Sequence, residues 1–178
     1  MQQRDVPAII VSPYMHLAQV LDHTDVSYVV SILGQSDKLD WPDVGSRRVL
    51  RLQFDHITYS SGKFIAPTRE QIVELVEFGR NWNGAASILI HCRAGSSRSP
   101  GAAAIVAAAQ SRADTSSLVR RIALSKAYFR PHLGMLALAD SILAVTPGLV
   151  ELVRSLPVPT RTDVWGPIRI PLVAPSDD

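Results

Sequence analysis

A single cysteine, Cys92, lies in the stretch of the chain whose residue types are best suited to covalent chemistry. Arg98 follows six positions later, and Ser99 comes directly after it. A thiolate is a strong nucleophile, and a guanidinium binds two phosphate oxygens at once through its planar fork, which a lysine cannot do. A serine hydroxyl near the sulfur can stabilise the thiolate when it becomes the leaving group. The spacing therefore favours attack on a phosphate ester, with Cys92, Arg98 and Ser99 as catalytic residues.

The residues around the cysteine predict a strand, a tight turn and a helix. Ile88 to Ile90 is a short apolar run typical of a buried strand, and the alanine-rich run from Pro100 is typical of a helix with proline in its first turn. The N–H groups of residues 93–98 then converge at a helix N-terminus, which can seat a tetrahedral oxyanion and favours a thiolate. Gly95 permits the backbone dihedral angles of so tight a turn.

The run His91-Cys92-x5-Arg98-Ser99 resembles the phosphate-binding signature of cysteine-dependent protein tyrosine and dual-specificity phosphatases. The resemblance implies a cysteinyl-phosphate intermediate and no metal or other cofactor. It also implies that His91 is structural, with its ring hydrogen-bonded to backbone near the loop. Because the motif lies in the middle of the chain, the resemblance favours the dual-specificity type. The residues implied to bind phosphate are Arg93, Ala94, Gly95, Ser96, Ser97 and Arg98.

The leaving group of a phosphate ester departs faster when an acid protonates it. The family resembled here places an aspartate for this on a mobile loop, a few tens of residues before the cysteine. Asp55 lies 37 residues upstream (92 minus 55), and we predict that it is this acid. The alternative is that His56 occupies the acid position and that Asp55 only caps or orients it. Three other aspartates are less suitable because their own loop is rich in turn residues: Asp37, Asp40 and Asp43.

Two other functions use a similar loop. A pseudophosphatase would bind phosphorylated residues without cleaving them, and it would need neither a reactive thiol nor an acid. A rhodanese-like sulfurtransferase or an arsenate-reducing enzyme would also carry a cysteine on an anion-binding loop. Arsenate reduction of the phosphatase-related type commonly requires further cysteines, which this chain lacks. Cyanide-dependent release of thiocyanate would identify a sulfurtransferase.

Length and composition indicate one compact domain. With 178 residues, of which 47% are hydrophobic and 19% charged, the chain can bury a core without dividing into domains. A net charge of +2 gives no reason to expect a nucleic-acid partner, and the longest apolar run, Gly101 to Ala109, is too short for a membrane span. Residues 1–7 lack the apolar core of a signal peptide, and one cysteine cannot form an intramolecular disulfide. We therefore expect a cytoplasmic protein. The family resemblance implies that its partner is a phosphorylated protein or a small phosphomonoester.

The order of the predicted elements indicates an α/β fold with a central, mostly parallel sheet of about four or five strands flanked by helices. Strands are expected at 9–11, 28–33 and 49–54 before the strand that ends at the cysteine, and the first two are expected to pair in parallel. The ligand is expected outside the carboxyl ends of the strands. This order resembles the dual-specificity phosphatase fold, with a helical second half. Helices are expected around 17–21, from 68 onward, and at 100–110, 116–129, 133–145 and 148–156.

Residues 1–156 form the predicted phosphatase domain, and residues 157–178 form a proline-rich C-terminal arm. Ile168, Ile170 and Leu172 alternate with other residues as in an edge strand. We expect an ordered arm that lies on its own domain, or on a second subunit in a homodimer formed through the arm. A disordered tail is the alternative.

Overall fold

One central sheet runs through the computed structural model, which describes residues 6–110, 114–125, 130–157 and 166–172. Its strands are β1 (Ala8–Pro13), β2 (Val26–Leu33), β3 (Arg48–Gln53), β4 (Ser87–Cys92) and β5 (Ile168–Pro171). They lie in the order β3-β2-β4-β1-β5, and all neighbours are parallel except β5, which runs antiparallel to β1. The predicted α/β fold with a mostly parallel sheet is confirmed.

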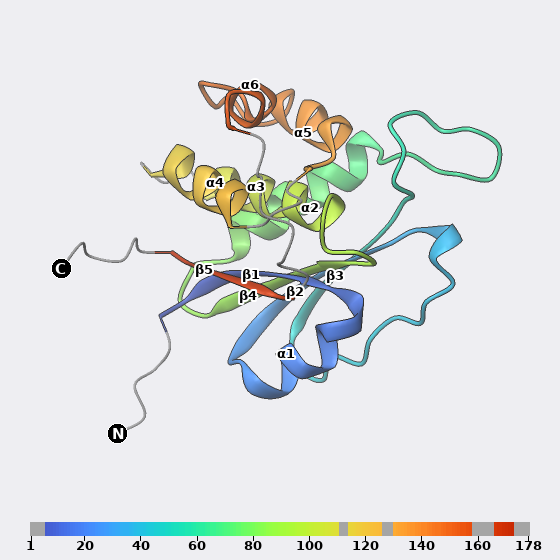
Figure 1. The fold of residues 1–178 in the computed structure, drawn as a ribbon, viewed down its shortest axis with the longest axis vertical. Coiled ribbons are helices and arrows are strands. Elements are labelled where there is room, and N and C mark those ends of the chain that lie inside the picture. Colours follow the sequence, from blue (N-terminus) through green and yellow to red (C-terminus); the bar gives the residue numbers. More distant parts are fainter. Residues whose placement is uncertain (1–5, 111–113, 126–129, 158–165, 173–178) are drawn as a thin grey trace.

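Helices cover the two faces of the sheet unequally (Figure 1). Among the described helices, α1 lies on one side of the sheet and the other five lie on the opposite side, where α5 packs on α2 and α3, and α6 packs on α4 and α5. None of the described helices has the length and apolar character needed to cross a membrane. The helices are α1 (Leu17–His23), α2 (Arg69–Asn81), α3 (Arg98–Ala109), α4 (Thr115–Leu124), α5 (Leu133–Asp140) and α6 (Leu149–Arg154), with short 3-10 helices η1 (Tyr14–His16) and η2 (Gln35–Asp37).

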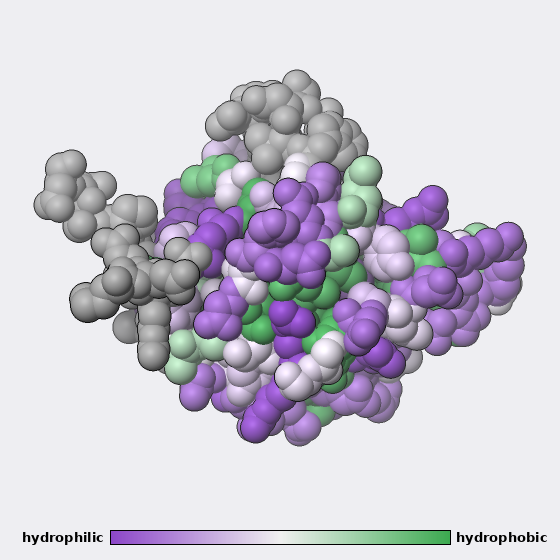
Figure 2. All heavy atoms as spheres, turned by 90° about the horizontal axis from the view of Figure 1, so that it is seen from below, coloured by the Kyte–Doolittle hydropathy of each residue, from purple (hydrophilic) through white to green (hydrophobic). Residues whose placement is uncertain are grey.

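Both faces of the sheet bury apolar side chains, because successive residues of a strand point to opposite sides. In β1, Ile9 and Val11 belong to the large core under α2 to α6, whereas Ala8 and Ile10 belong to a smaller core under α1. The surface seen from the α1 side is mainly hydrophilic around a small hydrophobic area (Figure 2). A strand buried on both sides reads as a nearly continuous apolar run, which is the pattern of β1 and β4, whose residues are all buried.

Helix α3 is the central helix of the larger layer, and all its residues are buried. It contacts β1, β4, α2, α4 and α5. Small residues allow close packing: a Cβ at Gly79 of α2 would lie 3.1 Å from the Cβ of Ala109 and 3.2 Å from the Cα of Val106. The sheet and its helix layer therefore fix the start of α3 against the end of β4.

Three sequence predictions need correction. The first two strands, β1 and β2, are parallel but do not pair with each other, because β4 lies between them. The predicted helix 116–129 ends at Leu124, with residues 126–129 outside the described ranges, and the predicted helix 133–145 ends at Asp140. The edge strand expected in the C-terminal arm, by contrast, is present as β5 beside β1, so this part of the arm packs on its own domain.

Candidate active site

The turn between β4 and α3 carries the cysteine, because β4 ends at Cys92 and α3 begins at Arg98. Gly95, in the middle of this turn, has a φ of +69°, and a Cβ there would lie 2.6 Å from the backbone nitrogen of Pro13. The end of β1 therefore presses against the turn. Glycine meets both requirements, the left-handed backbone and the close contact.

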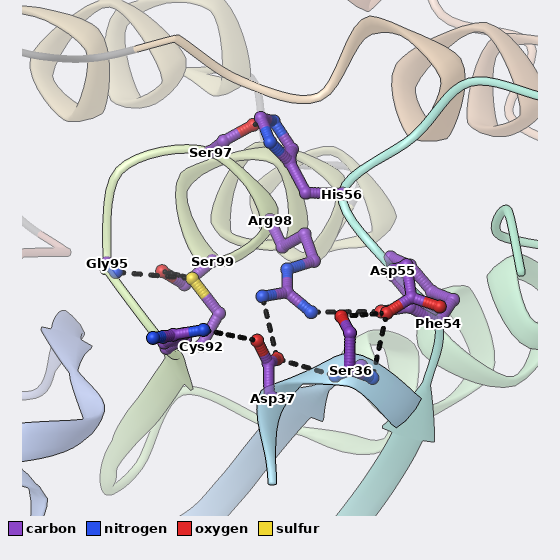
Figure 3. A network of polar contacts seen from close by, with 12 residues as sticks. Ser36, Asp37, Phe54, Asp55, His56, Cys92, Gly95, Ser97, Arg98 and Ser99 are labelled. Atoms are coloured by element: carbon purple, nitrogen blue, oxygen red, sulfur yellow. Dashed lines mark hydrogen bonds and ion pairs between the residues drawn. The ribbon is translucent and has the colours of Figure 1, made fainter. Parts of the chain in front are cut away.

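Hydrogen-bonding groups surround the sulfur of Cys92. The N–H of Gly95 donates to Sγ at 3.2 Å, and Ser99 Oγ lies 3.1 Å from Sγ (Figure 3). Both groups can stabilise a negative sulfur. The residue as a whole is only 2% exposed. Cys92 is therefore almost completely buried at the start of the turn.

The side chain of Arg98 is held from two neighbouring strands (Figure 3). Its Nη1 donates to the carbonyl oxygen of Phe54, which follows β3, at 2.9 Å. Its Nη2 donates to the Asp37 carboxylate, which follows β2, at 2.9 Å. Arg98 is 6% exposed and Asp37 is 9% exposed, so this ion pair is buried. Two separate anchors fix the plane of the guanidinium.

A pocket of about 240 Å³ opens over the turn. Cys92 and Arg98 both line it, and so do four of the residues that the resemblance implies for phosphate binding: Arg93, Ala94, Ser96 and Ser97. Asp37 and His56 complete the lining, whereas Asp55 is not part of it. The pocket thus combines a cysteine sulfur, guanidinium groups and one imidazole.

Asp55 lies beside the pocket with its carboxylate turned into the protein, and it is 2% exposed. Ser36 donates to Oδ1 through both its amide and its hydroxyl, and the amide of Ile65 donates to Oδ2 at 2.9 Å. Burial alone would raise the pKa of Asp55, but these hydrogen bonds and the charge of Arg98 together hold it below its ordinary value. The Asp55 N–H also donates to the carbonyl of Ile65, so Asp55 closes the neck of the loop 55–66.

His56 lies at the mouth of the pocket, with its Nε2 2.8 Å from Ser97 Oγ. Its ring contacts the ring of His132 edge to face, with 5.5 Å between centroids. His132 caps α5, since its Nδ1 accepts from the Met135 N–H, and its Nε2 donates to the Ile57 carbonyl at 2.9 Å. Burial, with the charges of His56 and Arg98, lowers the pKa of His132. His132 therefore ties the residue after His56 to the start of α5.

His91, at the end of β4, is fully buried, and its Nε2 hydrogen-bonds to Ser31 Oγ on β2. The expected hydrogen bond from its ring to backbone near the loop is not seen: among the described residues Nδ1 has no partner. Burial lowers the pKa of His91 to about 4. His91 is therefore a neutral core residue linking β4 to β2.

Comparison with known proteins gives no match to a protein-family model and none to a curated protein sequence. Solved structures do match. The crystal structure of a mouse putative dual specificity phosphatase complexed with zinc tungstate is similar with a TM-score of 0.53 and 13% identity, over 72% of this chain and 76% of that one. The chain has the fold of the dual-specificity phosphatases. The structure of Tk-PTP in its active form is also similar, with a TM-score of 0.48 and 16% identity, over 88% of this chain and 100% of that one.

Within this dual-specificity phosphatase fold, sequence reasoning missed two residues near the cysteine. The sequence disfavours Asp37 because its loop is rich in turn residues, yet Asp37 comes four residues after the end of β2, at the edge where the strands end. His132 follows Arg130-Pro131 and precedes a helix, which could have indicated an N-cap. In the described part of the chain, no group of three or more His, Cys, Asp and Glu residues could hold a metal ion.

Proposed function

We propose that this protein hydrolyses phosphomonoesters, on a phosphorylated protein or a small molecule, through a cysteinyl-phosphate intermediate. The observation that carries the proposal is that Cys92 and Arg98 line one small pocket while the Gly95 amide donates to the sulfur. Such a pocket brings a nucleophile and a guanidinium to the same phosphate group. A reducing cytoplasm would suit this chemistry, because oxidation would destroy the thiolate.

In the first step the Cys92 thiolate attacks phosphorus, so that an S–P bond forms while the P–O bond to the leaving group breaks. Arg98 and the amides of the turn bind the remaining phosphate oxygens. The protonated ring of His56 gives its proton to the departing oxygen. The products are an alcohol or phenol and the cysteinyl-phosphate.

In the second step water attacks the phosphorus of the cysteinyl-phosphate. The now neutral ring of His56 accepts a proton from this water, and the P–S bond breaks. Ser99 Oγ, 3.1 Å from the sulfur, stabilises the thiolate as it leaves. Orthophosphate is released, and both the thiolate and the protonated His56 are restored. Positive charge comes from Arg98 and oriented amides, so the proposed steps call on no metal ion.

We assign the acid to His56 and a supporting role to Asp55. His56 lines the pocket, whereas the carboxylate of Asp55 accepts three hydrogen bonds inside the protein. A carboxylate whose pKa is lowered is ionised at neutral pH and has no proton to give. Because Asp55 precedes His56 and closes the neck of the loop, it can hold His56 at the mouth of the pocket.

The nucleophile is tested by comparing the wild type with Cys92→Ser on p-nitrophenyl phosphate. We expect turnover by the wild type and, in the variant, a loss on the order of 10⁴-fold or more. Tungstate binding, measured by calorimetry, should survive in Cys92→Ser because Arg98 and the amides remain. A wild type that binds tungstate but turns over no faster than Cys92→Ser would indicate a pseudophosphatase instead.

The acid is tested with two leaving groups, phenolate and the better leaving group p-nitrophenolate. His56→Ala should lower kcat about 100-fold on phenyl phosphate and much less on p-nitrophenyl phosphate, because only the poorer leaving group needs protonation. His23→Ala, which changes an exposed histidine on α1, is the matched control and should not change kcat. If Asp55→Asn shows this leaving-group dependence and His56→Ala does not, Asp55 is the acid.

A further inference from the structure

Asp37 is a buried carboxylate whose contacts are those of a counter-ion. It lies in η2, and its side chain is 6% exposed. Its Oδ2 accepts from the N–H of Gly34 at 2.6 Å and from Nη2 of Arg98 at 2.9 Å. Its Oδ1 lies 3.7 Å from Nη1 of Arg93, which is 63% exposed. A buried carboxylate needs such partners, and the closest charged one is Arg98.

These contacts leave Arg98 able to bind an oxyanion. A guanidinium has five N–H bonds, and the contacts with Asp37 and Phe54 use one on each terminal nitrogen. The Nε–H and one N–H on each terminal nitrogen remain. Two of them can bind two phosphate oxygens through one fork of the guanidinium. Arg98 is thus fixed on one side and available on the other.

We propose that Asp37 is a positioning residue that holds the Arg98 guanidinium over the turn so that it meets an oxyanion without rearrangement. The proposal rests on the proposed function, because it assigns Arg98 to the phosphate. Asp37 contacts neither the sulfur nor the leaving group in this scheme. Fixing a long, flexible side chain before the ligand arrives removes the loss of side-chain freedom from the binding step.

Removing the Asp37 charge has two opposite effects on oxyanion binding. Whether Asp37→Asn tightens or weakens that binding therefore shows which role of Asp37 dominates. As a neighbouring negative charge alone, Asp37 would repel an oxyanion, so that Asp37→Asn would tighten oxyanion binding. As the anchor of Arg98, its loss frees the guanidinium, so that Asp37→Asn weakens binding. The contact with Arg98 is direct and buried, which favours the second effect.

The experiment measures tungstate affinity by calorimetry in a double-mutant cycle of Asp37→Asn and Arg98→Ala. We expect Asp37→Asn to weaken tungstate binding at least about tenfold in the wild-type background and less than about twofold in the Arg98→Ala background. The kcat/KM for p-nitrophenyl phosphate should fall in parallel. Asp40→Asn, an exposed aspartate in the same loop, is the control and should leave both quantities unchanged.

Tighter or unchanged tungstate binding in Asp37→Asn overturns the proposal. An equal loss in both backgrounds also overturns it, because Asp37 then acts on the fold rather than through Arg98. The rate of Cys92 alkylation by iodoacetamide reports an intact turn, and we expect it to change less than about twofold in Asp37→Asn. Failure of the proposed function would differ from all of these, since the wild type itself would then show no turnover that depends on Cys92.

Discussion

At the scale of single residues, Gly34 is a position in the turn after β2 where a side chain would collide with the groups beside the pocket. A Cβ at this position would lie 2.4 Å from Asp55 Oδ1 and 3.2 Å from Nη1 of Arg98. The Gly34 N–H also donates to Asp37. The absence of a side chain at one residue therefore lets Asp37, Asp55 and Arg98 gather at one end of the sheet.

Gly34→Ala should disturb both catalysis and stability. The added methyl must displace the carboxylate of Asp55, and overpacking of this kind typically costs about 1–3 kcal/mol of stability. Because Asp55 holds together the two ends of the loop that carries His56, we expect kcat on phenyl phosphate to fall about tenfold or more. Gly166→Ala is the matched control, since a Cβ there would meet nothing within 4 Å. Wild-type kcat in Gly34→Ala would contradict this account of the turn.

His91 makes the stability of the protein depend on pH. Burial lowers its pKa from 6.5 to about 4 in the folded state, so between these values the unfolded chain binds a proton that the folded chain does not. The contribution of neutral His91 to the free energy of unfolding is therefore fully present above pH 6.5 and is lost as the pH falls toward 4. From the size of the shift, the loss amounts to about 3 kcal/mol.

Urea unfolding at pH 7 and pH 4.5 measures this contribution. We expect the wild type to lose more of its free energy of unfolding between the two pH values than His91→Asn, which cannot titrate in this range. His16→Asn, with an imidazole outside the core, is the control and should behave as the wild type does. An equal pH dependence in the wild type and His91→Asn would show that His91 does not cause it.

At the scale of elements, the start of α5 is coupled to the loop that carries His56. His132 accepts the Met135 N–H as the N-cap of α5 and donates to the carbonyl of Ile57. One imidazole therefore satisfies a free amide of the helix and anchors the loop. The two roles can be separated because asparagine is also a good N-cap residue but is shorter than histidine.

His132→Asn and His132→Ala should differ in stability but not in catalysis. Both lose the contact with Ile57. We therefore expect a similar fall in kcat on phenyl phosphate, whose leaving group is protonated by His56 in the proposed mechanism. Only His132→Ala also loses the cap, which should make it about 1 kcal/mol less stable than His132→Asn by urea unfolding. If both variants keep wild-type kcat, the anchor on Ile57 does not position His56.

The sequence predicts those features of the site that are local in the chain. The strand, turn and helix around Cys92 occupy one continuous segment, residues 87–109, so their order alone indicates a turn at which Cys92 and Arg98 come together, and both residues line the pocket. The hydrogen-bond partners of Arg98 are not local in the chain, because Asp37 is 61 positions away from it and Phe54 is 44 positions away. They meet Arg98 because β2 and β3 lie side by side next to β4, and sheet order is set by packing rather than by local pattern.

The same reasoning explains the uncertainty between Asp55 and His56. Adjacent residues at the end of a strand point in different directions, so a shift of one residue decides which side chain faces the pocket. Here the contacts of Ser36 and Ile65 turn Asp55 inward. Those contacts involve residues from two separate loops. Spacing from the cysteine therefore locates the loop but not the residue that faces the pocket.

At the scale of the whole molecule, β5 closes one edge of the sheet. It pairs with β1, with Ile9 opposite Ile170 and Val11 opposite Ile168. The apolar side chains of Ile168, Ile170 and Leu172 are all buried in the large core. Burial of each such side chain is worth about 1.5–3 kcal/mol, which together approaches the total stability of an ordinary domain. The predicted boundary at residue 156 would therefore separate the domain from a strand of its own sheet.

Removal of residues 157–178 should destabilise the domain and expose the edge of β1. From a loss of several kcal/mol we expect Tm to fall by roughly 10–20 °C, measured by circular dichroism. Removal of residues 173–178 alone keeps β5 and is the matched control, with Tm close to that of the full chain. A Tm unchanged by the longer deletion would mean that β5 contributes little to the sheet in solution.

The oligomeric states of the full chain and of the same two variants test the predicted homodimer through the arm. Removal of residues 157–178 can either cause association or abolish it, and the two results indicate different roles of the arm. An unpaired edge strand invites association with another chain, so loss of β5 from a monomer should increase the mass measured by light scattering. If the arm instead joins two subunits, the full chain is a dimer and the longer deletion is a monomer. Because β5 already occupies the edge of its own sheet, we expect the first result: a monomeric full chain and association only after the strand is removed.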